Sequence, residues 1–118
     1  APGPLAAEPQ AVATVDVSDS GLTLVGNIPA GVQIIRVTNS GQLLHESNLL
    51  QIAPGASAQI FLAAISDPGA GGPLPGRPLG GVQAIDPGAH TYFTADFKPG
   101  SYAFLDFASG TGIDFTVQ

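Results

Sequence analysis

Glycine and proline recur so often along this chain that few stretches are long enough for a helix. The 118 residues include 16 glycines and 11 prolines. Glycine suits turns, and proline lacks the backbone donor that a helix interior needs. The runs between them are short and rich in valine, isoleucine, threonine and phenylalanine, a composition typical of strands. The sequence therefore predicts an all-β domain of seven to eight short strands, arranged as a sandwich or a barrel.

Composition and charge narrow the classes of function. Lysine and arginine total only 3 against 9 aspartates and glutamates, which gives a formal net charge of −6. Such a surface is poorly suited to nucleic acid, and an acidic chain favours a basic partner. No apolar run approaches the roughly 20 residues of a membrane-spanning helix. The sequence contains no cysteine, so disulfides, thiolate ligands and cysteine nucleophiles are excluded.

The chain divides into a short leader and one domain. Residues 1–10 contain three prolines and no apolar periodicity, so we expect a flexible N-terminal leader there. Residues 11–118 are expected to form a single domain. The opening Ala1-Pro2-Gly3-Pro4 resembles a processed terminus, which favours a secreted, periplasmic or cell-envelope protein whose signal peptide has been removed.

The middle of the chain predicts one helix followed by a long loop. Ser57 is a suitable N-cap for a helix over residues 57–65, and its apolar residues repeat at three-to-four spacing: Ile60, Phe61, Ala64 and Ile65. Residues 67–81 are rich in glycine and proline and carry Arg77. We expect these residues to form a surface loop, which is either a contact element or a mobile excursion.

Apolar and polar residues alternate along the segment 89–97. Phe93, Ala95 and Phe97 fall on one face of the predicted strand, while the other face is polar and carries His90, Tyr92, Thr94 and Asp96. With Arg77, the side chains of His90 and Tyr92 are candidates for an interaction surface. An ordinary solvated outer face of a sandwich would have the same pattern.

Three stretches together resemble the cupredoxin family, the Greek-key β-sandwich of blue copper proteins. The segment 34–41 followed by His45-Glu46 resembles the family's strand, asparagine and first copper-binding histidine. The segment 98–102 (KPGSY) resembles its Pro-Gly-x-Tyr corner, and the closing strand 112–117 takes the place of its terminal strand. The resemblance covers roughly residues 11–118 and implies a Greek-key sandwich with one short helix and a long Gly/Pro loop.

The same resemblance implies that the copper site has been lost. Type 1 copper needs two imidazoles, a thiolate and a weak axial ligand. Asp106 stands at the position that the resemblance assigns to the thiolate, and the expected second histidine and methionine are missing from the following turn. Only His45 remains, so we expect no copper cofactor and no electron transfer through one.

His45, Glu46 and Asp106 are the candidate residues of this vestigial site. In the family, the strand face that carries Asp106 points inward, and a buried carboxylate needs a partner. We therefore hypothesise a His45–Asp106 pair that raises the pKa of His45. His45 could instead bond loop carbonyls, and Asp106 could lie hydrated at the rim. A non-blue Cu²⁺ or Zn²⁺ site is a further alternative, although neighbours on a strand such as His45 and Glu46 face opposite ways.

No catalytic motif accompanies these residues. The sequence lacks a Gly-x-Ser-x-Gly elbow, a Gly-Lys phosphate loop and a His-Glu-x-x-His helix. We therefore expect a non-enzymatic binding, interaction or structural module whose partner is a protein or a cell-envelope component. The alternative is a metal-binding or carrier protein that uses His45 and nearby carboxylates.

Overall fold

The computed structural model describes residues 8–67, 69 and 72–118, so most of the predicted leader lies outside the described residues. Within the described residues, the chain forms strands separated by turns and one helix, in the following order: β1 (Ala13–Ser18), β2 (Gly21–Val25), β3 (Gly31–Asn39), β4 (His45–Ile52), α1 (Ala58–Ser66), β5 (Gly76–Ile85), β6 (His90–Phe97), β7 (Gly100–Asp106) and β8 (Thr111–Val117). None of the described helical residues belongs to a helix able to cross a membrane.

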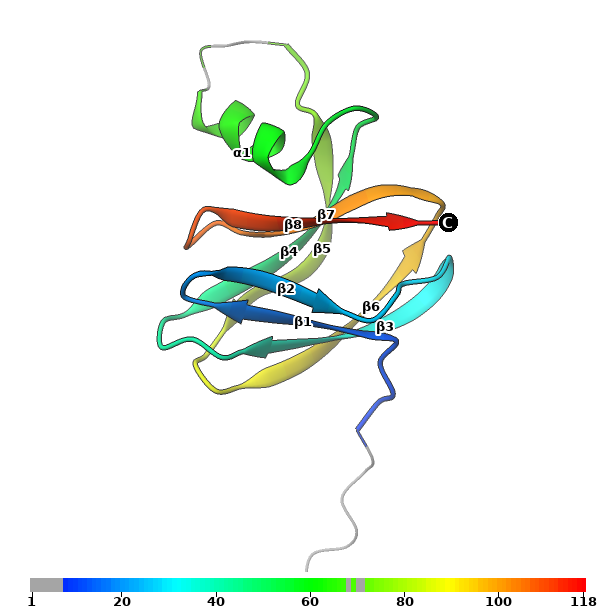
Figure 1. The fold of residues 1–118 in the computed structure, drawn as a ribbon, viewed down its shortest axis with the longest axis vertical. Coiled ribbons are helices and arrows are strands. Elements are labelled where there is room, and N and C mark those ends of the chain that lie inside the picture. Colours follow the sequence, from blue (N-terminus) through cyan, green and yellow to red (C-terminus); the bar gives the residue numbers. More distant parts are fainter. Residues whose placement is uncertain (1–7, 68, 70–71) are drawn as a thin grey trace, which may run out of the picture.

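The strands form two facing four-stranded sheets (Figure 1). One sheet has the order β2-β1-β3-β6, and the other has the order β5-β4-β7-β8. Only β1 and β3 are parallel; the other adjacent strands are antiparallel. The prediction of an all-β sandwich of seven to eight strands with one short helix is confirmed, and the described residues form eight strands.

The main core lies between the sheets and follows from alternation along the strands. In β1, Val15 and Val17 are fully buried, while the alternate residues Thr14, Asp16 and Ser18 are half-buried. The core also contains aromatic side chains that stack across β7 and β8: the ring of Phe115 lies 5.0 Å from that of Phe104 and 5.5 Å from that of Tyr102. Burial of these large apolar surfaces is the main force that holds the sheets together.

Helix α1 covers the outer face of the second sheet (Figure 1). Ser57 caps it as predicted, because its Oγ accepts a hydrogen bond from the Ile60 amide at 3.2 Å. A second apolar cluster fills the space between helix and sheet and comprises Leu50, Ile52, Ala58, Phe61, Ala103 and Leu105. The predicted apolar face was partly wrong: Ile60 is 49% exposed and Ile65 37% exposed. The helix turns Ala58 and Phe61 toward the sheet, so the buried stripe is rotated away from Ile60 and Ile65.

The predicted loop 67–81 is shorter than expected, because β5 already begins at Gly76. Arg77 and Pro78 lie in this strand, opposite Gln51 and Leu50 of β4. Proline and glycine are tolerated here since β5 is an edge strand, whose outer side needs no ladder hydrogen bonds. Register shifts in its pairing with β4 accommodate the irregular sequence.

Candidate functional site

His45 and Asp106 lie on the inner faces of two adjacent strands. His45 begins β4 and shares its inner face with Ser47 and Leu49, whereas Asp106 ends β7 beyond Phe104. Strands β4 and β7 are paired with Leu49 opposite Phe104, and in this register His45 and Asp106 are diagonal neighbours. The structure thus brings together the two residues that the sequence analysis proposed as a pair.

The contact between them is short and fully buried. His45 Nδ1 lies 2.6 Å from Asp106 Oδ2, and the two side chains are 2% and 0% exposed. The other carboxylate oxygen, Oδ1, accepts hydrogen bonds from the amides of Glu46 at 3.0 Å and Ala108 at 3.1 Å. The Ser109 hydroxyl donates to Oδ2 at 2.6 Å. These donors compensate for the burial of the carboxylate.

A second carboxylate, which the sequence analysis missed, occupies the other ring nitrogen. His45 Nε2 lies 2.7 Å from Oδ1 of Asp19, whose side chain is 42% exposed. Asp19 also accepts hydrogen bonds from the amides of Gln42 and Leu43. We call Asp19, His45 and Asp106 the carboxylate–imidazole bridge.

Strand order explains how Asp19 reaches this position. β1 and β3 are parallel neighbours, with Val17 opposite Asn39, so the segments that follow both strands meet at one end of the sandwich. Asp19 lies in the turn after β1, and residues 40–44 follow β3. The adjacency of β1 and β3 is the signal that would have found Asp19, and local sequence patterns do not contain it.

The segment before His45 is shaped by Asn39 and Gly41. The buried Asn39 amide donates to the carbonyls of Leu43 at 2.8 Å and Ile85 at 2.9 Å, and its Oδ1 accepts from the Gly41 amide. A side chain at position 41 would collide with the Asp19 carboxylate, so glycine is required there. These contacts fix the loop that presents His45 to both carboxylates.

The electrostatics of the bridge favour a charged imidazole. The hydrogen bond to Asp19, followed by the hydrogen bond and charge of Asp106, raises the pKa of His45 above 6.5, although burial opposes this effect. The pKa of Asp19 is correspondingly lowered, mainly by its hydrogen bond with His45. In the protonated form both ring nitrogens carry a hydrogen, so His45 donates to both carboxylates at once.

The donor set does not fit type 1 copper. The sequence offers no cysteine thiolate and no methionine thioether, which such a site needs. Each ring nitrogen of His45 already faces a carboxylate, and Glu46 turns away to accept a hydrogen bond from the Phe107 amide. Among the described residues, no three histidine, cysteine or acidic side chains are arranged to hold a metal ion.

The predicted interaction surface is divided between the sheets. His90 and Tyr92 lie together on β6, with their rings edge to face at 6.0 Å, and His90 Nε2 contacts the Glu8 carboxylate. Arg77 belongs to the other sheet, where its Nε donates to Gln51 Oε1 at 2.9 Å. His90 and Tyr92 therefore share one outer face, and Arg77 does not join them.

Comparison with known proteins supports the fold. The structure is similar to that of dithionite-reduced auracyanin from the photosynthetic bacterium Roseiflexus castenholzii, with a TM-score of 0.61 and 20% sequence identity over 89% of this chain and 94% of that one. It is also similar to auracyanin B, with a TM-score of 0.57 and 16% identity over 95% and 93% of the two chains. Auracyanins are cupredoxins, so the fold is cupredoxin-like. No protein-family model and no curated protein sequence matches the chain.

Proposed function

We propose that this chain is an exported, non-catalytic cupredoxin-like domain without type 1 copper, which acts as a structural or interaction module. The observation that carries the proposal is the carboxylate–imidazole bridge, in which His45 lies between Asp19 at 2.7 Å and Asp106 at 2.6 Å. Asp106 occupies the position that the family resemblance assigns to the copper thiolate.

The bridge supplies a cross-link of the kind that a metal ion would otherwise provide. Asp19 belongs to the turn between β1 and β2, His45 follows the loop after β3, and Asp106 precedes the turn between β7 and β8. Hydrogen bonds between charged groups are stronger than neutral ones, especially away from water. The bridge therefore joins both sheets at this end of the sandwich with protein groups alone.

The same geometry argues against nucleophilic catalysis at His45. A histidine that activates a hydroxyl needs one free ring nitrogen facing that hydroxyl. Here both nitrogens face carboxylates, and the nearby Ser109 hydroxyl donates to Asp106 rather than to the ring. A role in orienting or holding the loops agrees better with this arrangement.

Two surface properties support an interaction role. The chain has a formal net charge of −6, which favours a basic partner. The residues next to the bridge in the chain include exposed apolar side chains, Leu43 at 63%, Leu44 at 53% and Phe107 at 43%. These exposed side chains are available for contact with a partner.

A non-blue Cu²⁺ or Zn²⁺ site is the second candidate, and one observation favours it. Asp19 is 42% exposed, so movement of this side chain would open His45 Nε2 to an ion from solvent. A site of this kind would use imidazole and carboxylate donors, which both ions accept. It would replace the contact between His45 and Asp19 rather than add to it.

Titration with copper sulfate and with zinc chloride separates the two candidates. We expect no blue charge-transfer absorption and no stoichiometric binding that broadens or shifts the His45 ring resonances. The matched control is His90→Ala, which removes the exposed histidine and any weak binding there. Stoichiometric micromolar binding that persists in His90→Ala and disappears in His45→Gln would overturn the proposal in favour of metal handling. Cell fractionation of the native protein tests export separately, and recovery in the cytoplasm would contradict it.

A further inference from the structure

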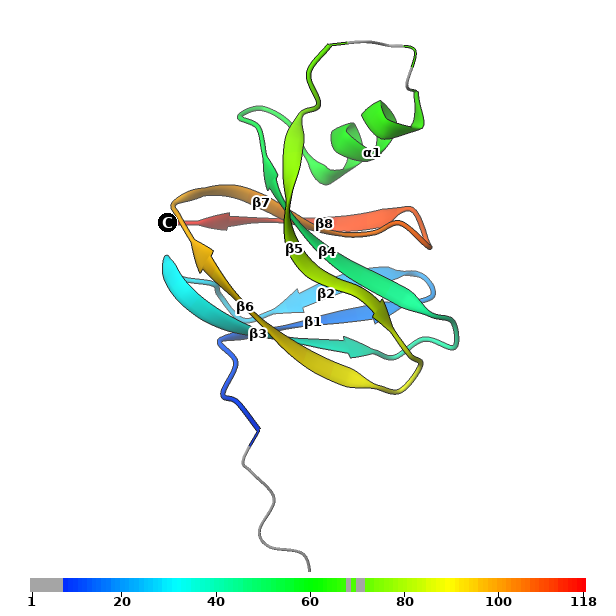
Figure 2. The same ribbon diagram turned by 180° about the vertical axis from the view of Figure 1, so that it is seen from behind.

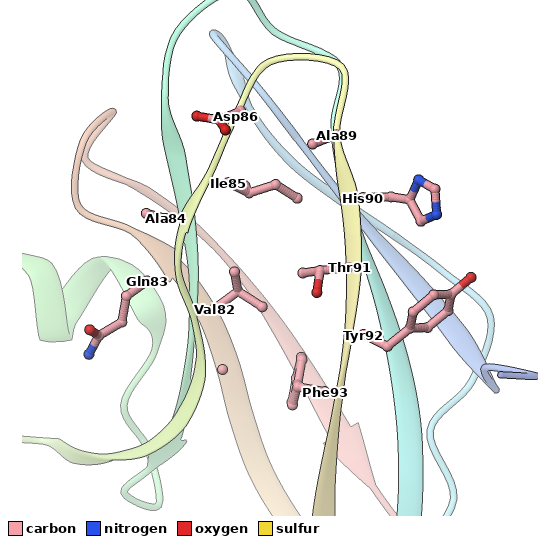
Figure 3. Close-up of a pocket in the computed structure, with 11 residues that line it drawn as sticks. Val82, Gln83, Ala84, Ile85, Asp86, Ala89, His90, Thr91, Tyr92 and Phe93 are labelled. Atoms are coloured by element: carbon pink, nitrogen blue, oxygen red, sulfur yellow. The ribbon is translucent and has the colours of Figure 1, made fainter. Parts of the chain in front are cut away.

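The two lateral edges of the sandwich differ in how closely the sheets approach each other. On one side β2 packs against β7 and β8, so the edges of the sheets cover each other. On the other side lie β5 and β6 (Figure 2). These two strands border a groove of about 630 Å³ that is open to solvent, and Figure 3 shows its lining residues. Figure 3 shows Val82, Ile85 and Phe93 directed into the space between the strands, whereas His90 and Tyr92 point away from it.

Along this groove, β6 has backbone hydrogen-bonding groups that no strand among the described residues pairs with. β6 is the last strand of its sheet in the described part of the chain. Asn39 of β3 extends the register of the pair, and its amide donates to the Ala89 carbonyl at 3.1 Å. In an antiparallel pair, every second residue of a strand forms backbone hydrogen bonds with the neighbouring strand. Since Ala89 bonds to Asn39, the odd-numbered residues of β6 are those that bond to β3. The amides and carbonyls that face the open edge therefore belong to His90, Tyr92, Thr94 and Asp96.

β6 also lacks the features that protect its neighbour across the groove. β5 contains Pro78, two register shifts and positive-φ glycines at positions 80 and 81. Such irregularities stop a further strand from pairing with an edge. β6 pairs with β3 through eight consecutive residues without a register shift, and it contains no proline. It is therefore the more suitable template for an added strand.

We propose that β6 pairs antiparallel with β6 of a second copy of this chain, about a twofold axis at Phe93. In this register the side chain of His90 lies opposite Asp96 of the second copy, and Tyr92 lies opposite Thr94. All these residues have edge-facing backbone groups, so the pairing supplies about eight hydrogen bonds. The β2-β1-β3-β6 sheets of the two copies then form one continuous sheet across the axis.

The pairing of a histidine with an aspartate at both ends of the strand pair is the reason to choose a second copy as the occupant, although the formal net charge of −6 on each copy opposes association. Only the register centred on Phe93 places a histidine opposite an aspartate at both ends of the strand pair. A shift of two residues places His90 opposite Thr94 or opposite Lys98 instead. Within one chain, Glu8 contacts His90 and Lys98 contacts Asp96, and all four side chains are between 41% and 73% exposed. These surface contacts can therefore rearrange or be shared when a second strand arrives.

The strand pairing names a partner for the proposed interaction module, and in that sense it rests on the proposed function. It depends on β6 and not on His45, so a monomeric protein would refute the pairing and leave the copper-free bridge unaffected. Conversely, metal binding at His45 would refute the proposed function without bearing on the strand pairing.

Sedimentation equilibrium of the full chain over a wide concentration range tests the pairing. We expect a reversible monomer–dimer equilibrium, with slower hydrogen exchange at the amides of residues 90, 92, 94 and 96 as the dimer fills. Thr94→Pro removes an edge-facing amide from each copy and should weaken association at least about tenfold. Thr94→Val keeps that amide and is the matched control, and each variant is checked for an unchanged amide spectrum away from β6.

A charge-swap series tests the register. His90→Asp places carboxylates opposite each other and should weaken the dimer, whereas the double variant His90→Asp with Asp96→His should restore it. A protein that stays monomeric at the highest concentration would overturn the proposal. A dimer that Thr94→Pro leaves unchanged, or a double variant that fails to recover association, would also overturn it.

Discussion

The two histidines of this chain each contact a carboxylate, but in opposite surroundings. His45 is 2% exposed and lies between two carboxylates at the end of the sandwich. His90 is 41% exposed on an outer sheet face, and its partner Glu8 is 62% exposed. Exposed ion pairs contribute little, since water and salt compete with them. We therefore expect burial and the number of donors, rather than the residue pair itself, to determine how much a histidine–carboxylate contact stabilises the fold.

Removal of the buried carboxylate should have the largest effect. Asp106→Ala removes the acceptor of His45 Nδ1, of the Glu46 and Ala108 amides and of the Ser109 hydroxyl. We expect the free energy of unfolding to fall by about 3–5 kcal/mol, measured by urea denaturation near pH 6. Glu8→Ala, which removes the acid from the exposed pair, should cause a much smaller loss.

Ser47→Ala is a control for burial alone. The Ser47 hydroxyl is buried and has no hydrogen-bond partner among the described residues. Its removal should be close to neutral or slightly stabilising, because no satisfied bond is lost. If Asp106→Ala were as mild as Ser47→Ala, the bridge would not be the cross-link that we describe.

The pH dependence of stability should distinguish the two histidines next. Asp19 and Asp106 raise the pKa of His45 above its ordinary value of 6.5, so the protonated ring stabilises the folded state. This contribution is complete below pH 6.5 and is lost as pH rises through the folded-state pKa. Asp19, with its lowered pKa, contributes above its ordinary value of 3.8 and loses this effect as pH falls through the folded-state value.

Unfolding free energies at a series of pH values, together with NMR titration of the ring protons, measure these changes. The decline on the alkaline side should disappear in His45→Gln and persist in His90→Gln. In Asp19→Asn the pKa of His45 should fall, since its largest upward influence is removed. A His45 pKa that is unchanged in Asp19→Asn would contradict the role that we assign to Asp19.

The smallest expected effect is at the exposed pair. His90→Ala removes a side chain that is 41% exposed and contacts the Glu8 carboxylate and the Tyr92 ring at the surface. The free energy of unfolding of the monomer should change by no more than about 0.5 kcal/mol. A loss comparable to that of Asp106→Ala would show that exposure does not separate the two sites.

The sequence was sufficient for the features that depend on local pattern. Alternation along residues 89–97 predicted the inner and outer faces of β6, and Ser57 was recognised as the cap of α1. Proximity of His45 and Asp106 came from the family resemblance, because a contact between residues 61 positions apart leaves no local trace. The specific partner, protein or otherwise, stays a prediction.

The features that were missed depend on how elements pack together. Asp19 belongs to an ordinary turn sequence and becomes part of the bridge only because β1 lies beside β3. The start of β5 was not predicted because proline and glycine are normal turn residues. A strand tolerates them when it lies at the edge of its sheet, as β5 does. The buried side of α1 was misassigned because the position of the helix on its sheet, rather than its apolar spacing, decides which residues face inward.

Strand β7, which carries Asp106, is covered on both faces. Residues Tyr102 to Asp106 are all buried, by the core on one side and by α1 on the other. Asp106 therefore belongs to a strand that is packed on both faces, whereas Asp19 lies in the turn between β1 and β2 and its side chain is 42% exposed. We therefore expect any opening of this end of the sandwich to begin at the hairpin that carries Asp19, while the contact between His45 and Asp106 persists.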